Sequence, residues 1–229
     1  MGFISSLESA FQENSDAKNA AVMAKYMRNH FAFFGIKTTE RRRLLKENWK
    51  GNEQELADNA RAIALALFAK KQREFHYCAI EILIKQLKRK YTKEDILLIE
   101  KLITANSWWD SVDSVAKNIL GEYLLEFPDE IMATIARFSD SDDMWLNRSA
   151  ILFQLGYKEK TNFDLLKTSC LKHKSSTEFF IQKVIGWALR EYGKTNPEKV
   201  REFVAVNNLK PLSRKEALKN ICMHKIIVN

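Results

Sequence analysis

Apolar residues recur along most of the chain at spacings of three and four positions. In one stretch they are Leu65, Phe68 and Ala69, and in the next they are Ala79, Ile80, Leu83, Ile84 and Leu87. This spacing places apolar side chains on one face of an amphipathic helix. Glycine and proline breaks separate such stretches, and Pro197 and Pro211 stand where a first helical residue is expected. The pattern predicts about twelve to fourteen helices and no strand.

Composition narrows the fold class further. The 229 residues include only 7 Gly and 3 Pro, too few for the frequent tight turns of a barrel or sandwich. With 46% hydrophobic and 29% charged residues, the chain lies in the globular range, which excludes wholesale disorder. No long polar linker interrupts it, so we predict a single domain over residues 1–229.

An aromatic residue near the start of an apolar helix recurs with a nearly constant period. Phe75, Trp109, Trp145 and Phe180 are separated by 34, 36 and 35 residues. A period of this length suits a pair of helices per unit, as in HEAT and armadillo repeats. We therefore predict an all-α fold, an α-solenoid of stacked HEAT-like repeats with a concave, positively charged groove.

The same period aligns three ionisable residues. Asp113, Arg148 and Lys183 are each 35 positions apart, so they should form a row on adjacent repeats. Trp109 lies four residues before Asp113, and Trp187 lies four after Lys183, which places each indole on the same helix face as its neighbour. One carboxylate, two cations and two indoles should then meet on one concave surface.

A purely structural interpretation of this row stays open. Tryptophan on an apolar helix face usually belongs to the core, and an Asp–Arg pair between helices is usually a structural ion pair. Against it, the segment SWWDSVDS at 107–114 is polar for a helix that only packs. Its adjacent residues Trp108 and Trp109 point in different directions, so they cannot share one core stripe.

Positive charge is concentrated in the C-terminal part of the chain. From Met144 onward there are 16 Lys/Arg against 7 Asp/Glu, a net charge of +9, whereas the first 143 residues carry a net charge of −1. One tight basic cluster, Arg41, Arg42, Arg43 and Lys46, lies outside this region. Regional positive charge of this kind favours a nucleic-acid backbone as partner, although any single lysine can simply solvate a helix face.

Cysteine and histidine residues show no metal-ligand spacing. The three cysteines (Cys78, Cys170, Cys222) form no CxxC motif, and we expect inert thiols in a reducing cytosol. The four histidines (His30, His76, His173, His224) form no HxxxH or HExxH set, so no metal is predicted. Neither a signal peptide nor a membrane-spanning run is apparent, and we expect a soluble, cytoplasmic protein.

Several motifs together resemble one known family. They are KYMRNHFAFFGIKTTERRRLLK at 25–46, SWWDSVDS at 107–114, WLNRSAILFQLGYK at 145–158, EFFIQKVIGWALREYGKTNP at 178–197 and PLSRKEALKNI at 211–221. These segments resemble the AlkD family of bacterial DNA glycosylases, and the likeness extends over nearly the whole chain. The tryptophan–aspartate segment is the most specific of them.

The resemblance implies an activity and a set of site residues. It implies a monofunctional DNA glycosylase, without metal or cofactor, that excises positively charged N3- and N7-alkylated purines such as 3-methyladenine and 7-methylguanine from duplex DNA in base excision repair. Asp113 would be the catalytic carboxylate, flanked by Trp109 and Trp187. By the same resemblance, Arg148 would contact the DNA backbone and Tyr26 would be a further contact to the DNA strand. From the repeat row and the basic charge we add the following as predicted DNA-binding residues: Lys183, Arg190, Lys158, Arg41, Arg42, Arg43 and Lys46. We also expect a monomer in the bacterial cytosol, associated with the nucleoid.

These residue types suit that chemistry. An N7- or N3-alkylated purine is already cationic, so its departure needs no general acid, and the sugar becomes oxocarbenium-like as the bond breaks. A fixed carboxylate such as Asp113 stabilises that cation and positions water. Arg148 and Lys183 should hold phosphates beside the lesion and keep the pKa of Asp113 low.

Two other functional classes stay open at this point. A non-catalytic HEAT-repeat protein could use the same basic face and tryptophans to bind distorted or branched DNA, and an assay for base release separates it from an enzyme. A HEAT-type scaffold for a protein or peptide would leave the C-terminal positive charge unused and would not be retained on DNA at low salt.

Overall fold

The computed structural model describes residues 2–219 and residue 221. Within them the chain is helical and contains no strand, only one isolated bridge between Ala32 and Gln72. The all-α prediction is confirmed. The chain divides into two compact units, Met1–Asn106 and Ser107–Asn229. The prediction of one domain over residues 1–229 stays a prediction.

The first unit contains six α-helices. They are α1 (Phe3–Glu13), α2 (Ala17–Tyr26), α3 (Thr38–Trp49), α4 (Glu53–Phe68), α5 (Arg73–Gln86) and α6 (Asp95–Thr104). The apolar periodicity forms its core: Phe3, Leu7 and Phe11 of α1 are buried, and α1 packs on α3 and α4. The ring of Phe11 lies 5.3 Å from that of Phe75 in α5. In contrast, α2 contains no buried residue.

The second unit contains the remaining helices. They are α7 (Trp109–Val115), α8 (Gly121–Glu126), α9 (Ile131–Asp140), α10 (Met144–Leu152), α11 (Phe163–Lys172), α12 (Phe179–Tyr192), α13 (Pro197–Val206) and α14 (Pro211–Leu218). A π-helical turn, Ala116–Leu120, joins α7 to α8, and short 3-10 turns cover Pro128–Glu130 and Lys158–Lys160. As expected, Pro197 and Pro211 each occupy an early position of their helix.

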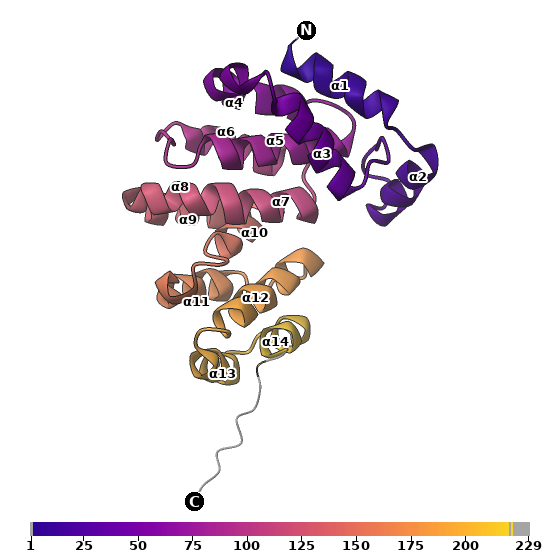
Figure 1. Cartoon of the computed structure of the whole chain (residues 1–229). Helices are drawn as coiled ribbons and strands as arrows, with labels where there is room; N and C mark the ends of the chain where they lie inside the picture. The colour runs from indigo at the N-terminus through magenta and orange to yellow at the C-terminus, as the bar shows by residue number, and fades with distance from the viewer. Residues whose placement is uncertain (1, 220, 222–229) are drawn as a thin grey trace, which may run out of the picture. The chain divides into compact units, whose positions relative to one another are not determined.

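Local sequence signals account for several helix starts. The side chains of Asp143, Asn162 and Asn196 each accept a hydrogen bond from a backbone N–H in the first turn of the helix that follows. Within each unit, helices pack mainly on helices that are near neighbours in the chain, for example α4 on α5 and α10 on α9 and α12 (Figure 1). Packing between chain neighbours is typical of stacked helical repeats, as the sequence period predicts.

Candidate active site

The structure brings Asp113 and Arg148 into direct contact in the second unit. Asp113 lies near the C-terminal end of α7, and Arg148 lies in the middle of α10. The Nε of Arg148 donates to Oδ1 of Asp113 at 2.7 Å, and its Nη2 donates to Oδ2 at 2.8 Å. The side chains are 5% exposed for Arg148 and 13% exposed for Asp113. The carboxylate is therefore fixed in orientation but still reachable from solvent.

Arg148 also connects this carboxylate to α12. Its third donor, Nη1, reaches the backbone carbonyl of Phe180 at 2.5 Å, and its guanidinium carbon lies 5.9 Å from the centre of the Phe180 ring. Each of its three terminal nitrogens thus donates to an acceptor inside the protein. In this arrangement Arg148 holds Asp113 in place; its expected contact with a DNA phosphate stays a prediction.

The expectation that cations keep the pKa of Asp113 low is wrong in direction. Burial raises the pKa of Asp113 above its ordinary value by more than the hydrogen bonds and charge of Arg148 lower it. Asp110 adds a small further rise through charge repulsion. The bidentate geometry is nevertheless that of an ionised carboxylate, so Arg148 is the group that keeps a desolvated Asp113 charged.

Three aromatic side chains form a cluster at the starts of α7, α10 and α12. The ring of Trp108, just before α7, lies 5.9 Å from the ring of Trp145 and 5.2 Å from that of Phe180, and the last two rings are 5.1 Å apart. Sequence reasoning assigned the repeated aromatic position to Trp109, but Trp108 is the residue that makes these contacts. Trp109 is half-buried in the first turn of α7, four residues before Asp113.

Lys183 and Arg190 contact a carboxylate other than that of Asp113, and the row of Asp113, Arg148 and Lys183 on adjacent repeats stays a prediction. Both bind one carboxylate of α14: Lys183 lies 2.8 Å and Arg190 2.7 Å from Glu216. Hydrogen bonds from these two cations lower the pKa of Glu216 to about 2. Trp187, on the same helix, is half-buried and packs against the core of the second unit, so its role beside Asp113 stays a prediction.

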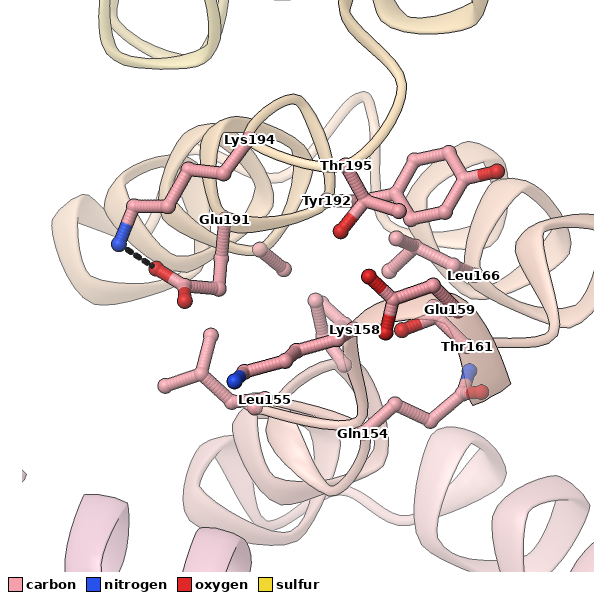
Figure 2. A pocket seen from close by; sticks show the side chains of 13 residues that line it. Gln154, Leu155, Lys158, Glu159, Thr161, Leu166, Glu191, Tyr192, Lys194 and Thr195 are labelled. Atoms are coloured by element: carbon pink, nitrogen blue, oxygen red, sulfur yellow. Dashed lines mark ion pairs between the residues drawn. The ribbon is translucent and has the colours of Figure 1, made fainter.

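Lys158 lines a partly open hollow of about 220 Å³ between α10, α11 and α12 (Figure 2). It adopts a left-handed conformation with φ 55°, which is uncommon for a residue with a side chain. The hollow is also lined by Glu159 and by the Glu191–Lys194 ion pair (Figure 2). Asp113 is not among its lining residues. The assignment of Lys158 to DNA binding stays a prediction.

The basic cluster of the first unit divides into inward and outward members. Arg41 is buried and reaches Glu81 of α5 at 2.9 Å, and the exposed Arg42 reaches the same oxygen of Glu81, also at 2.9 Å. Arg43 pairs with Glu40 and Glu47 of its own helix. Lys46 is exposed and makes no ion pair with any described residue. These contacts leave Arg42 and Lys46 as the cluster members most open to a ligand.

Tyr26 ends α2 and is 69% exposed. The segment that follows α2 returns to its start at Gly35, whose φ of 89° and close approach to Asp16 exclude a side chain: a Cβ there would lie 2.1 Å from the carbonyl oxygen of Asp16. The buried carboxylate of Glu74 accepts hydrogen bonds from the backbone N–H groups of residues 34–36, at 2.9 to 3.2 Å. Thus α2, although it buries no side chain, is held by backbone contacts.

Two of the three cysteines are described. Cys78 and Cys170 are buried thiols, and burial raises the pKa of Cys78 to about 12 and raises that of Cys170 further. Cys222 and His224 lie outside the described residues. Among the described residues, no group of three His, Cys, Asp or Glu is placed to hold a metal ion, and no helix is long and apolar enough to cross a membrane.

Comparisons with known proteins point to one family. A family model described as "DNA alkylation repair enzyme" matches residues 7–221. A solved structure described as a predicted DNA alkylation repair enzyme from Enterococcus faecalis is 34% identical in sequence to this chain. The likeness covers 91% of this chain and 97% of that one, with a TM-score of 0.80. A search of curated proteins gave no match.

Proposed function

The chain belongs to the DNA alkylation repair enzyme family, and on that basis we propose that it is a monofunctional DNA glycosylase. Its substrates are duplex DNA containing positively charged N3- and N7-alkylated purines, such as 3-methyladenine and 7-methylguanine. It acts as a cytoplasmic monomer in base excision repair and uses neither metal nor cofactor.

The observation that supports this proposal best is the carboxylate of Asp113. Both of its oxygens are fixed by Arg148, yet the side chain keeps 13% of its surface exposed. A preorganised charge in a poorly hydrated position stabilises a developing opposite charge more strongly than the same charge in water. Asp113 is thus suited to a positive charge that forms only in the transition state.

The proposed reaction needs little more than this charge. The cationic purine leaves with the electrons of the glycosidic bond, and C1′ of the deoxyribose becomes oxocarbenium-like. Asp113 stabilises that cation and orients a water molecule whose oxygen attacks C1′. The free base and an abasic site are the products, and the proton lost by the water passes to Asp113 or to solvent.

We assign the aromatic residues of the site a supporting role. Trp109 and Trp187, which we propose to flank the lesion, would offer indole faces that attract cations and pack on sugars. Asp113 does not line the hollow of Figure 2, which agrees with a reaction in which the damaged base is not extruded into a deep pocket. The proposed DNA contacts are Arg148, Lys183, Arg190, Lys158, Tyr26, Arg41, Arg42, Arg43 and Lys46.

The decisive experiment compares the wild type with Asp113→Asn. Release of free 7-methylguanine from methylated duplex DNA should fall about 1,000-fold or more in the variant, because the asparagine is isosteric but uncharged. Binding to undamaged DNA and the melting temperature are measured in parallel, so that misfolding is recognised. An unchanged rate of release in a folded variant would refute the role of Asp113.

A second candidate function has support from the same contact. A buried aspartate–arginine pair often serves packing alone, and a family member that binds distorted or branched DNA without cleaving a bond would keep it for that reason. Such a protein would release no alkylated base at any enzyme concentration, and Asp113→Asn would alter only its stability.

A further inference from the structure

The first unit contains an open hollow of about 470 Å³ whose lining is rich in lysine. It lies where α3 ends, α4 begins and α5 ends. Its lining residues are Arg42, Leu45, Lys46, Trp49, Lys50, Glu53, Glu81 and Lys85. We call it the α3–α5 hollow. Only two of these residues, Arg42 and Lys46, belong to the basic cluster that the sequence indicated.

The cations of the hollow outnumber its carboxylates, and the carboxylates are already engaged. Glu81 accepts hydrogen bonds from Arg41 and Arg42, which help to lower its pKa although burial opposes them. Glu53 accepts from the backbone N–H of Gly51 at 2.8 Å. Among the described residues, by contrast, Lys46, Lys50 and Lys85 have no carboxylate partner. Three ammonium groups therefore remain available to an anion.

An indole forms the apolar part of the hollow. Trp49 ends α3 and is half-buried, and the amine of Lys85 lies 3.9 Å from the centre of its ring. Lysine binds phosphate as a point charge, and an indole packs against sugars and bases. Cations beside an aromatic side chain are the combination expected of a surface that contacts a nucleic-acid backbone.

We propose that the α3–α5 hollow binds the phosphate backbone of duplex DNA away from the damaged nucleotide, with Lys46 and Lys85 on phosphates and Trp49 against a deoxyribose. The proposal rests on DNA being the partner of this chain, but it does not depend on Asp113 or on base release. It assigns a function to Lys85 and Trp49, which no sequence motif indicated.

A competing explanation is that these lysines only stabilise helix ends. Lys46 and Lys85 lie in the last turns of α3 and α5, and Lys50 caps α3, where positive charge interacts favourably with the helix dipole. That explanation predicts a loss of stability on substitution and no change in DNA binding.

The test is a double variant, Lys46→Gln with Lys85→Gln, and its ligand is an undamaged, fluorescently labelled duplex. Anisotropy titrations at several salt concentrations should give a dissociation constant raised roughly 10-fold or more near 0.1 M salt. The slope of log affinity against log salt should fall by about 1.8, because each lost phosphate contact removes about 0.9. The matched control is Lys71→Gln with Lys88→Gln, which removes the same charge from two exposed lysines outside the hollow.

Trp49→Phe gives an independent readout. Subtracting the emission of this variant from that of the wild type isolates the Trp49 signal, which should change when duplex is added but not when inorganic phosphate alone is added. A change with inorganic phosphate alone would mean that the hollow binds a free anion rather than DNA, which overturns the proposal.

Further outcomes would overturn the proposal as well. One is an unchanged affinity and salt slope in the double variant, with or without a lower melting temperature. Another is an equal loss in the control pair, which would mean that only net charge matters. All measurements use undamaged DNA, so they stand apart from the excision test of Asp113→Asn.

Discussion

Arg148 binds both carboxylate oxygens of Asp113 across 35 residues of sequence, and the same guanidinium binds the backbone of Phe180. This single side chain connects α7, α10 and α12. Removing one partner of a largely buried ion pair leaves the other charge buried without compensation. Removing both partners costs less stability, because no uncompensated charge remains. Arg148 therefore determines both the position and the charge state of Asp113.

Replacing Arg148 by lysine should slow base release more than it weakens DNA binding. Lysine keeps the positive charge but cannot bind two oxygens and the carbonyl of Phe180 in the planar geometry of a guanidinium. We expect release of 7-methylguanine at saturating enzyme to fall at least about 10-fold, with the salt dependence of DNA binding unchanged. Because lysine keeps the charge, a contact of residue 148 with a phosphate is compatible with an unchanged salt slope. An unchanged rate of release would contradict the positioning role of Arg148.

Arg148→Met should destabilise the second unit by about 3–5 kcal/mol, because the carboxylate of Asp113 loses its buried partner. The double variant Arg148→Met with Asp113→Asn removes both charges and should recover part of that loss. Urea denaturation of the four proteins measures the coupling between the two residues. Independent, additive effects would show that the pair contributes no interaction energy.

The raised pKa of Asp113 has consequences of opposite sign for activity and stability. Base release needs the ionised carboxylate, so it should decrease on acidification through a pKa above that of an ordinary aspartate. At Asp113 the folded protein binds a proton more tightly than the unfolded chain does. The contribution of Asp113 to the free energy of unfolding therefore decreases as pH rises from about 3.9, the ordinary pKa, to the pKa in the folded protein. Single-turnover rates and urea denaturation over that interval check both effects. Asp113→Asn should remove the corresponding component of the stability profile.

Glu216→Gln should strengthen DNA binding by the second unit. In the wild type this carboxylate binds both Lys183 and Arg190, and these two cations are proposed to face phosphates. In the Glu216→Gln variant, Lys183 and Arg190 no longer have to leave a carboxylate in order to bind a DNA phosphate. The affinity for undamaged duplex and the salt slope should therefore both increase. Glu198→Gln, which loses a more exposed pair with Arg201, is the control. Equal effects of the two variants would show that only net charge changed.

The same carboxylate should make the second unit sensitive to acid. The pKa of Glu216 is lowered to about 2 in the folded protein from an ordinary value of 4.5. The stabilisation by ionised Glu216 is therefore fully present above pH 4.5 and is lost as the pH falls from 4.5 towards about 2. Thermal melts of the wild type and of Glu216→Gln should differ near neutral pH and converge in strong acid.

Gly35→Ala should loosen α2 without unfolding the core of the first unit. The new Cβ would lie 2.1 Å from the carbonyl oxygen of Asp16, in a backbone conformation with φ 89° that favours glycine. Hydrogen exchange of the amides of α2 should become faster, while amides of α4 and α5 keep their protection. If the exposed Tyr26 contacts DNA, affinity for duplex falls in the same variant. Unchanged exchange in α2 would contradict the anchoring role of residues 34–36.

The sequence predicted the helices from the local spacing of apolar residues, and it placed Asp113 beside Arg148 from the 35-residue repeat period. The repeat period does not indicate which other partners the fold supplies to each side chain. Lys183 shares the repeat position of Arg148 but binds Glu216, a residue of α14 that no repeat spacing placed beside it. Arg41 belongs to an apparent surface cluster yet is buried, because Glu81 of α5 accepts its hydrogen bond.

The pKa of Asp113 and the choice between two adjacent tryptophans illustrate the same limit. The sequence shows the charged residues near Asp113 but not the burial that removes water from it. Desolvation has the larger effect on the pKa of Asp113. Sequence reasoning also assigned the repeated aromatic position to Trp109, whereas Trp108, one residue earlier, packs on Trp145 and Phe180. A helix pattern alone does not fix where the first turn begins.

The burial of Cys78 and Cys170 affects how a DNA alkylation repair protein reacts with alkylating agents. Electrophiles that methylate purines also attack thiolates, and a thiolate is the reactive form of cysteine. Both thiols stay protonated and enclosed, with the pKa of Cys78 raised to about 12. At these two positions the protein is protected against modification during exposure to an alkylating agent. The same protonated, enclosed state makes these two sulfur atoms unsuitable as acceptors in a repair route that transfers the alkyl group onto the protein itself.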